Sequence, residues 1–299
     1  MKEDEAFPVA LKLALQETII EYRQDKYLES DPILFPRRYQ NPFDIEIIGL
    51  LSCLYAYGNV KAIKGFLNPF FLALGPSPYL TFTENKHTLH RIANQMGYYR
   101  FQTAEDNAIL LFSLASIVKH HAKTKSIQPI FESYFLNQSG SFEPDAGITS
   151  FQRQLESYIL KFTNENQLTR GLRFLIGDPN SKSAKKRICL FLRWMVRTDF
   201  PDFGLYTKIH AKDISFPLDV HIQRLIKILG ISSRKHYGMR ESILVRDFFL
   251  KLNKDDPLLY DFYLTRVGMI QKCRGVKINE ICDPCSLKTI CLIGSATGN

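Results

Sequence analysis

Four cysteines near the end of the sequence indicate a chemical function more clearly than any other residues in it. Cys273, Cys282, Cys285 and Cys291 are separated by eight, two and five residues. Thiolates are soft ligands that bind iron–sulfur clusters or zinc. A structural zinc site usually combines two short ligand pairs, and only one such pair, Cys282 and Cys285, is present. The spacing therefore favours a four-iron, four-sulfur (4Fe-4S) cluster over zinc, and unligated buried thiols are the remaining alternative.

A single carboxylate, Asp219, begins a second segment that is suited to chemistry. It follows Phe216-Pro217-Leu218 and precedes residues 220–229, whose apolar side chains recur at the spacing of an amphipathic helix. A carboxylate fixed in this position can stabilise a developing positive charge or orient a nucleophile. The alternative is that Asp219 only accepts hydrogen bonds from backbone N–H groups at the start of the helix.

A basic segment, residues 182–197, precedes this carboxylate. It contains six Lys or Arg residues and no acidic residue, on a helix that is expected to start near Ser181 or Ser183. Clustered Lys and Arg most commonly neutralise phosphates, so the segment predicts contacts with a nucleic-acid backbone. Lys185, Lys186 and Arg187 are the first candidates. Arg193 and Arg197 follow on the same helix and either extend that surface or form a solvated face.

These segments together resemble the endonuclease III-like, helix-hairpin-helix DNA glycosylases. The four-cysteine loop, the motif Leu218-Asp219-Val220-His221 and the apolar helix beginning Pro42-Phe43-Asp44 occur in that family's order over roughly 250 residues. The whole chain is most similar to a bacterial branch of the superfamily. The resemblance implies an enzyme that binds double-stranded DNA, turns a damaged or mismatched base out of the duplex and cleaves its N-glycosidic bond.

The resemblance also assigns roles to individual residues. Asp219 matches the family's catalytic Asp, and the four cysteines match its cluster ligands. Arg274 and Lys277 lie between the first two cysteines, where the family's cluster loop contacts the DNA backbone. Three further residues fall where the family forms the wall of the base pocket and the wedge that fills the gap left by the base: Leu54, Tyr55 and Tyr57. Ordinary core packing is the alternative for these three.

The turn between the two helices of the hairpin departs from the family's pattern. The family uses a Gly-hydrophobic-Gly turn to bind a DNA phosphate, and a following Lys forms a Schiff base in members that also cleave the strand. Here the turn is Gly177-Asp178-Pro179-Asn180, and Lys182 is in the best register for the amine, with Lys185 and Lys186 as rivals. AP-lyase activity is therefore left open. The missing glycine pair favours a second hypothesis, a non-catalytic protein that binds structured DNA or RNA; a third is a zinc-stabilised interaction protein that binds no nucleic acid.

The bulk properties of the chain agree with a polyanionic partner. Its 299 residues carry a net charge of +9, which favours nucleic acid first and an acidic membrane surface second. The N-terminus is acidic and lacks the apolar core of a signal peptide, and no apolar run reaches the roughly 20 residues that span a bilayer. We therefore expect a cytoplasmic, nucleoid-associated monomer with no membrane partner.

The elements that position these residues are expected to be helices. Apolar stripes at helical spacing recur along the chain, and no alternating runs bounded by hairpin turns are found. The predicted fold is all-α, in the two-lobed helix-hairpin-helix glycosylase-like arrangement with a C-terminal cluster loop. One domain would be a helical barrel of residues 41–205, with the helix-hairpin-helix near 168–197. The other would combine residues 1–40 and 206–299, carrying Asp219 and the cysteine loop at 273–291.

Overall fold

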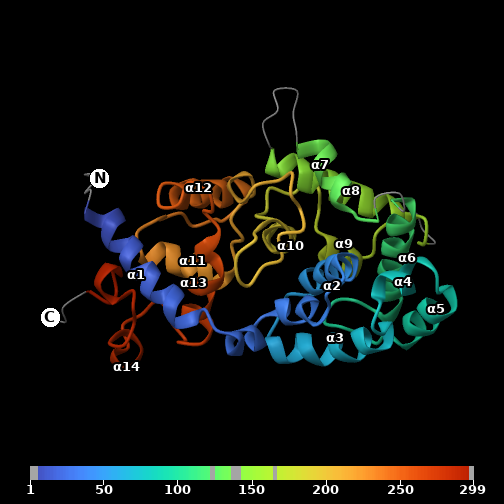
Figure 1. Ribbon diagram of the computed structural model, residues 1–299, viewed down its shortest axis with the longest axis horizontal. Coiled ribbons are helices and arrows are strands. Elements are labelled where there is room, and N and C mark those ends of the chain that lie inside the picture. The colour runs from blue at the N-terminus through green and yellow to red at the C-terminus, as the bar shows by residue number, and fades with distance from the viewer. Residues whose placement is uncertain (1–5, 122–124, 136–142, 164–166, 296–299) are drawn as a thin grey trace. The chain divides into compact units, whose positions relative to one another are not determined.

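The structure, a computed structural model, describes residues 6–121, 125–135, 143–163 and 167–295 (Figure 1). Within these ranges the regular elements are helices, and only two isolated β-bridges occur in place of strands. The prediction of an all-α fold is therefore confirmed. No helix in the described part of the chain is both long enough and apolar enough to cross a membrane.

The chain divides into two compact units. Unit 1 comprises Met1–Ser30, Lys182–Gly204 and His210–Asn299, and unit 2 comprises Asp31–Ser181 and Leu205–Ile209. These boundaries differ from the predicted ones chiefly in placing Lys182–Gly204 with the segment that carries Asp219. The physical reason is a set of buried ion pairs, described below, that joins this segment to residues 256–261 of unit 1.

Unit 2 contains most of the helices of the first half of the chain. Its α2 is the central helix that the sequence predicts, and every residue from Asp44 to Leu54 is buried. Asn41 caps it by accepting a hydrogen bond from the N–H of Phe43 at 2.9 Å, and Pro42 occupies the first turn. The elements of this unit are η2 (Pro32–Leu34), η3 (Pro36–Arg38), α2 (Pro42–Leu54), α3 (Val60–Leu74), α4 (Pro78–Thr83), α5 (Lys86–Gln95), α6 (Ala104–His120), α7 (Gln128–Phe135), α8 (Pro144–Leu160) and α9 (Arg170–Ile176).

A buried carboxylate on α2 explains why residues 205–209 belong to unit 2. Glu46 accepts hydrogen bonds from the hydroxyl groups of Ser126 and Tyr206, both at 2.6 Å, and from the N–H of Ile127 at 3.1 Å. Burial raises the pKa of Glu46, and these donors oppose the shift. The carboxylate thus connects three separate segments of the chain.

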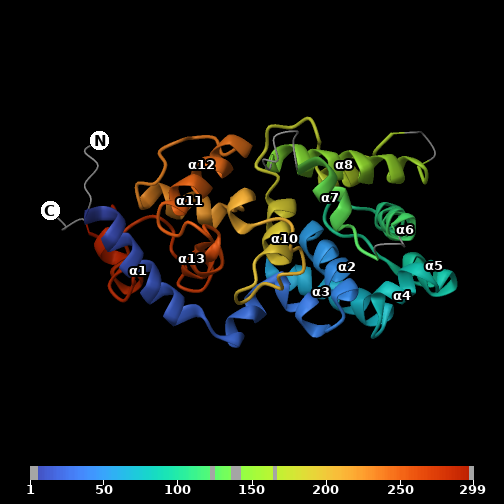
Figure 2. The same ribbon diagram turned by 45° about the horizontal axis from the view of Figure 1, so that its top comes forward.

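Unit 1 is arranged around α13. Its neighbours α1 and α11 both pack against it, and the contact of α1 with η5 brings the N-terminal helix beside the cysteine segment (Figures 1 and 2). The elements of this unit are α1 (Ala6–Tyr22), η1 (Asp25–Ser30), α10 (Lys186–Val196), η4 (Ala211–Asp213), α11 (Val220–Ile228), α12 (Met239–Leu250), α13 (Leu259–Met269), α14 (Asn279–Cys282) and η5 (Lys288–Ile290).

The expected helix pair near residues 168–197 is present as two helices that belong to different units, α9 in unit 2 and α10 in unit 1. The second helix begins at Lys186, later than predicted. Ser183 instead forms a β-bridge with Gly238, and Lys185 takes a left-handed backbone conformation with φ of 44°. These two features keep residues 181–185 out of the helix.

Candidate functional site

Asp219 is the N-cap residue of α11 and lies half-buried in unit 1. Its Oδ1 accepts hydrogen bonds from the N–H groups of His221 at 2.8 Å and Ile222 at 2.7 Å. The preceding segment is fixed by Phe216, whose carbonyl accepts a 2.5 Å hydrogen bond from the Ser242 hydroxyl. Both cap bonds use one carboxylate oxygen, so Oδ2 takes no part in the cap. Asp219 therefore caps α11 through Oδ1, and the cap does not use Oδ2.

His221 lies in the first turn of the same helix and is a neutral neighbour of Asp219. Burial lowers the pKa of His221 below its usual value of 6.5, while the Asp219 charge opposes the shift. Its Nδ1 is buried and has no hydrogen-bond partner among the described residues. The charge of Lys186, at the start of α10, also lowers this pKa, so Lys186 acts electrostatically on the first turn of α11.

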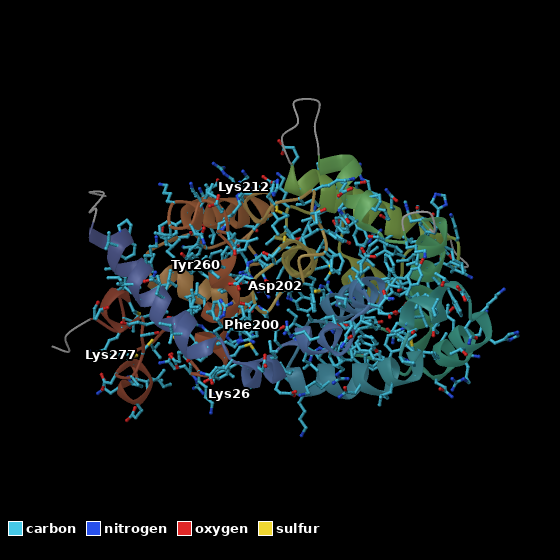
Figure 3. The ribbon with its side chains drawn as sticks, viewed as in Figure 1. Lys26, Phe200, Asp202, Lys212, Tyr260 and Lys277 are labelled. Atoms are coloured by element: carbon cyan, nitrogen blue, oxygen red, sulfur yellow. The ribbon has the colours of Figure 1, made fainter. Side chains whose placement is uncertain are left out.

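A buried ion network occupies the interior of unit 1, where Figure 3 labels Asp202. Arg193 pairs with Asp261 and, at 3.1 Å, with Asp202. Arg197 pairs with Asp202 and, at 2.9 Å, with Asp256. Both arginine side chains are only 1% exposed. They therefore form neither a DNA-contact surface nor a solvated face, the two alternatives that the sequence suggested.

The network is electrostatically coupled to Asp219. Burial raises the pKa of Asp261 from 3.8 to about 6, Arg193 opposes this shift, and the negative charge of Asp219 adds to it. A carboxyl group that titrates near neutral pH therefore lies within electrostatic reach of the candidate catalytic carboxylate.

The predicted basic residues of the hairpin differ in their exposure. Lys182 is exposed, whereas the Lys185 side chain is buried, and Lys186 and Arg187 are half-buried. The Lys182 carbonyl accepts a hydrogen bond from the N–H of Met239 at 3.0 Å, which fixes its backbone. Lys182 and Lys186 thus remain as amines for chemistry, and the structure couples only Lys186 to the first turn of α11.

The four predicted cysteine ligands line one pocket of unit 1, together with apolar side chains of α11 and α13 such as Leu225 and Val267. Burial raises the pKa of the Cys273 thiol, and Cys291 and Cys282 contribute to the same shift, which shows that these thiols are neighbours. Burial likewise raises the pKa of the Cys285 thiol, with smaller contributions from Cys273 and Cys291. The fold therefore brings together four thiols that span 19 positions of the sequence.

The two candidate cofactors require different arrangements of these thiols. No group of three or more His, Cys, Asp or Glu side chains among the described residues is arranged to hold a metal ion. A zinc site needs four sulfurs at about 2.3 Å from one ion. The four thiolates of a 4Fe-4S cluster are further apart, because each binds a different iron atom. The four cysteines line one largely apolar pocket.

Basic side chains lie on and beside the cysteine segment, which also carries the exposed acidic residues Glu280 and Asp283. Arg274 and Lys277 are exposed, and Figure 3 labels Lys277 on this segment. Arg224 of α11 donates a 2.6 Å hydrogen bond to the carbonyl of Cys273. Gly275, with φ of 73°, allows that approach, because a Cβ there would lie 3.1 Å from the Arg224 Cγ. The cysteine segment is thereby attached to the helix that Asp219 caps.

Of the three residues predicted for a base pocket or wedge, Leu54 and Tyr55 belong to the core of unit 2. Both are 0% exposed, and the Tyr55 hydroxyl donates a 2.7 Å hydrogen bond to Asn107. They present no surface on which a base can stack. Tyr57 is half-buried and is therefore the one of the three with an exposed part.

Tyr57 belongs to a partly exposed aromatic cluster that the sequence analysis did not identify. Its ring centroid lies 4.9 Å from that of Phe174 and 6.3 Å from that of Phe101, and the Arg100 guanidinium lies 5.9 Å from its ring. Phe101 and Phe174 are 46% and 40% exposed. The run Tyr98-Tyr99-Arg100-Phe101 was the signal in the sequence, but it lies between two helices, and a run of aromatic residues does not show which rings face solvent.

Comparison with known proteins assigns the chain to a family whose description names no activity. A family model described as "Protein of unknown function (DUF2400)" matches residues 31–270. The match includes Asp219 and ends before Cys273. No curated protein and no solved structure matches the chain.

Proposed function

The chain belongs to the DUF2400 family, whose description names no activity, and we propose that it excises damaged or mismatched bases from DNA by cleaving the N-glycosidic bond. The observation that carries the proposal is the state of Asp219. Its Oδ1 is held by two backbone N–H groups, while Oδ2 lies outside the cap. A carboxylate held in this way is oriented before substrate binds, which is what electrostatic catalysis requires.

The chemistry follows from the charge that develops on the sugar. As the base departs with the bonding electron pair, positive charge appears at the sugar carbon, and the Asp219 carboxylate stabilises it. Water then adds to this carbon, and Asp219 accepts the proton that the water loses. Because the pKa of His221 is lowered, its imidazole adds no positive charge beside the Asp219 carboxylate at neutral pH.

Strand cleavage would require an amine in place of water. Lys182 is the amine that the sequence predicts, and its side chain is exposed. Lys186 is the better-placed rival, because its charge already acts on the first turn of α11. An amine that attacks the sugar carbon forms a Schiff base, which borohydride reduces to a stable adduct.

The cysteine pocket supports a structural cofactor. Cys273, Cys282, Cys285 and Cys291 would hold a 4Fe-4S cluster, whose chemical contribution is to crosslink the cysteine segment through four iron–thiolate bonds. Arg224 would then fix this segment to α11, and Arg274 and Lys277 would contact the DNA backbone.

The aromatic cluster of unit 2 supports contact with an unpaired base. Tyr57, Phe101 and Phe174 offer ring faces and edges, and Arg100 adds a cation beside them. Bases stack on such side chains with about 1–3 kcal/mol each. We therefore propose that Tyr57 and its neighbours contact a base displaced from the duplex.

A second function, non-catalytic binding of structured DNA or RNA, is favoured by one specific observation. Asp219 already has a complete structural role as a helix cap, so its presence alone does not require chemistry. The two hypotheses differ in whether Oδ2 is needed.

Base release from a panel of lesion duplexes tests the proposal. Duplexes that carry oxidised, alkylated, deaminated or mismatched bases are incubated with the anaerobically purified protein, and free base is measured. Release from at least one duplex supports a glycosylase, and binding without release from any of them supports the second function. Borohydride added to the wild type, Lys182→Ala and Lys186→Ala identifies any amine that forms an adduct.

A further inference from the structure

Two segments of unit 1 that are far apart in the sequence meet in a basic surface. The carbonyl of Lys182 accepts a 3.0 Å hydrogen bond from the N–H of Met239, and Ser183 forms an antiparallel bridge with Gly238. Residues 182–187 and 232–240 are thereby held side by side. We call this pair of segments the basic bridge.

The basic bridge presents positive charge from both of its segments. Neither residues 182–187 nor residues 232–240 contain an Asp or Glu, and the side chains of Lys182, Lys235, His236 and Arg240 are exposed. Glu241, the next acidic residue, is buried and is engaged by Ser232 and Arg234, the latter at 3.0 Å. Within the described part of the chain, no carboxylate pairs with the side chains of Lys182, Lys235 or Arg240.

A glycine makes this approach of the two segments possible. A Cβ at Gly238 would lie 2.5 Å from the carbonyl oxygen of Lys182, so any other residue would push the segments apart. The hydroxyl of Tyr237 donates a hydrogen bond to the carbonyl of Gln223 in α11 at 3.3 Å. The basic bridge is therefore attached to the helix that Asp219 caps.

We propose that the basic bridge binds the phosphate backbone of duplex DNA, an inference that rests on the proposed function and extends its DNA-contacting surface to residues 232–240. Charge complementarity identifies the occupant. Cations from two segments with no acid between them suit a partner with closely spaced phosphates, and the net charge of +9 favours the same class of partner.

Salt-dependent binding of undamaged, labelled duplex DNA tests the proposal by fluorescence anisotropy. Lys235→Ala/Arg240→Ala removes two cations of the basic bridge, and Lys251→Ala/Lys254→Ala removes two exposed cations beyond the end of α12 as a matched control. The first variant should lose about tenfold in affinity at low salt, and its log–log salt slope should fall by about 1.8, since each neutralised phosphate contributes about 0.9. Equal losses in both variants, or none in the first, would overturn the proposal.

Gly238→Ala tests the geometry without altering any charge. Its affinity for duplex DNA should fall although its net charge is unchanged, and circular dichroism should show a folded protein. Wild-type affinity in a folded Gly238→Ala protein would show that the two segments do not act together, against the proposal.

Failure of this inference and failure of the proposed function give different results. If no lesion duplex releases a base, yet only the basic-bridge variant loses affinity, DNA binding by the basic bridge is supported and the proposed base excision is contradicted. If bases are released and the basic-bridge variant binds DNA as the wild type does, the proposed base excision is supported and DNA binding by the basic bridge is contradicted. Tighter wild-type binding to duplex RNA or to vesicles that contain phosphatidylserine than to duplex DNA would also overturn the DNA assignment.

Discussion

The side chain of His221 lies directly against the backbone of α13 at Gly268. A Cβ at position 268 would come within 2.6 Å of the His221 Cβ and 2.7 Å of its Nδ1. The first turn of α11 therefore approaches α13 only because residue 268 has no side chain. Asp219, two residues before His221, is positioned by the same contact between the helices.

Gly268→Ala should destabilise unit 1, although alanine is the better helix former. The clash with His221 should cost about 1–3 kcal/mol of unfolding free energy, since an overpacked site has to shift its backbone. Urea unfolding measures this change. Base release, where the wild type shows it, should fall as well, because α11 carries Asp219.

The matched control for this substitution is Gly65→Ala in α3. No atom lies within 4 Å of a Cβ built at Gly65, so the alanine meets no obstacle there. We expect this variant to gain about 0.5–1 kcal/mol from helix propensity. A Gly268→Ala protein that gained as much would show that the His221 contact is not tight.

Asp219→Asn should separate capping from catalysis. Asn caps helices as well as Asp does, so the unfolding free energy should change by less than about 0.5 kcal/mol. The negative charge is lost, and base release should fall about 100-fold or more. Single-turnover base release and urea unfolding are the two measurements.

Asp219→Ala removes both the cap and the charge. It should lose about 1 kcal/mol of stability in addition to its activity. If Asp219→Asn released bases at the wild-type rate, Asp219 would not be a catalytic residue.

Because of Asp261, the free energy of unfolding should fall as the pH rises from about 4 to about 6. Its pKa is about 6 in the folded protein, above its ordinary value of 3.8, so between these values the folded state holds a proton that the unfolded state has lost. Its contribution to stability is therefore complete below about pH 4 and is lost as the pH rises to about 6. The loss amounts to about 3 kcal/mol at most.

The difference in unfolding free energy between the wild type and Asp261→Asn, measured from pH 4 to pH 7, isolates this contribution. The wild type should lose stability relative to the variant as the pH rises. A constant difference across this range would mean that Asp261 is already ionised at pH 4.

The cysteine pocket predicts a cluster in the anaerobically purified protein. About four iron atoms and four acid-labile sulfides per chain are expected, and Cys285→Ser should reduce both, because one of the four thiolate ligands is lost. Iron, sulfide and zinc analyses measure the outcome. Zinc without iron would instead support the zinc-stabilised interaction protein.

Cys189→Ser is the matched control for the cluster. Cys189 is buried in unit 1, lies outside the lining of the cysteine pocket, and its thiol donates a hydrogen bond to the carbonyl of Ala184. The variant should keep the iron content of the wild type. A colourless, iron-free wild-type protein would contradict the cluster assignment altogether.

The aromatic cluster around Tyr57 predicts a loss of binding on truncation. Phe101→Ala should weaken the affinity for a lesion duplex by about 1–3 kcal/mol, the contribution of stacking one base. Leu72→Ala removes a side chain that is 77% exposed on α3 of the same unit and should leave affinity unchanged. Equal effects of the two substitutions, measured by anisotropy, would argue against base contact.

Local pattern alone was enough to predict that the chain is helical and that one helix begins at Pro42. Pro42 begins α2 as expected, with Asn41 as its N-cap, and Gly230, with φ of 71°, follows the end of α11. Such features depend on neighbouring residues, whose side chains satisfy or release the backbone groups at helix ends. The capping role of Asp219 could be predicted from the sequence for the same reason.

Only the tertiary structure decided what the basic residues and the aromatic residues do. Arg193 and Arg197 are indistinguishable in sequence from phosphate-binding arginines, yet Asp202, Asp256 and Asp261 reach them through the fold and bury them. The basic bridge likewise depends on pairing between residues more than 50 positions apart. The sequence by itself determined that the chain is helical and which residues carry charge or thiol groups. The fold decided which of these groups face solvent, because burial depends on partners that no local pattern reveals.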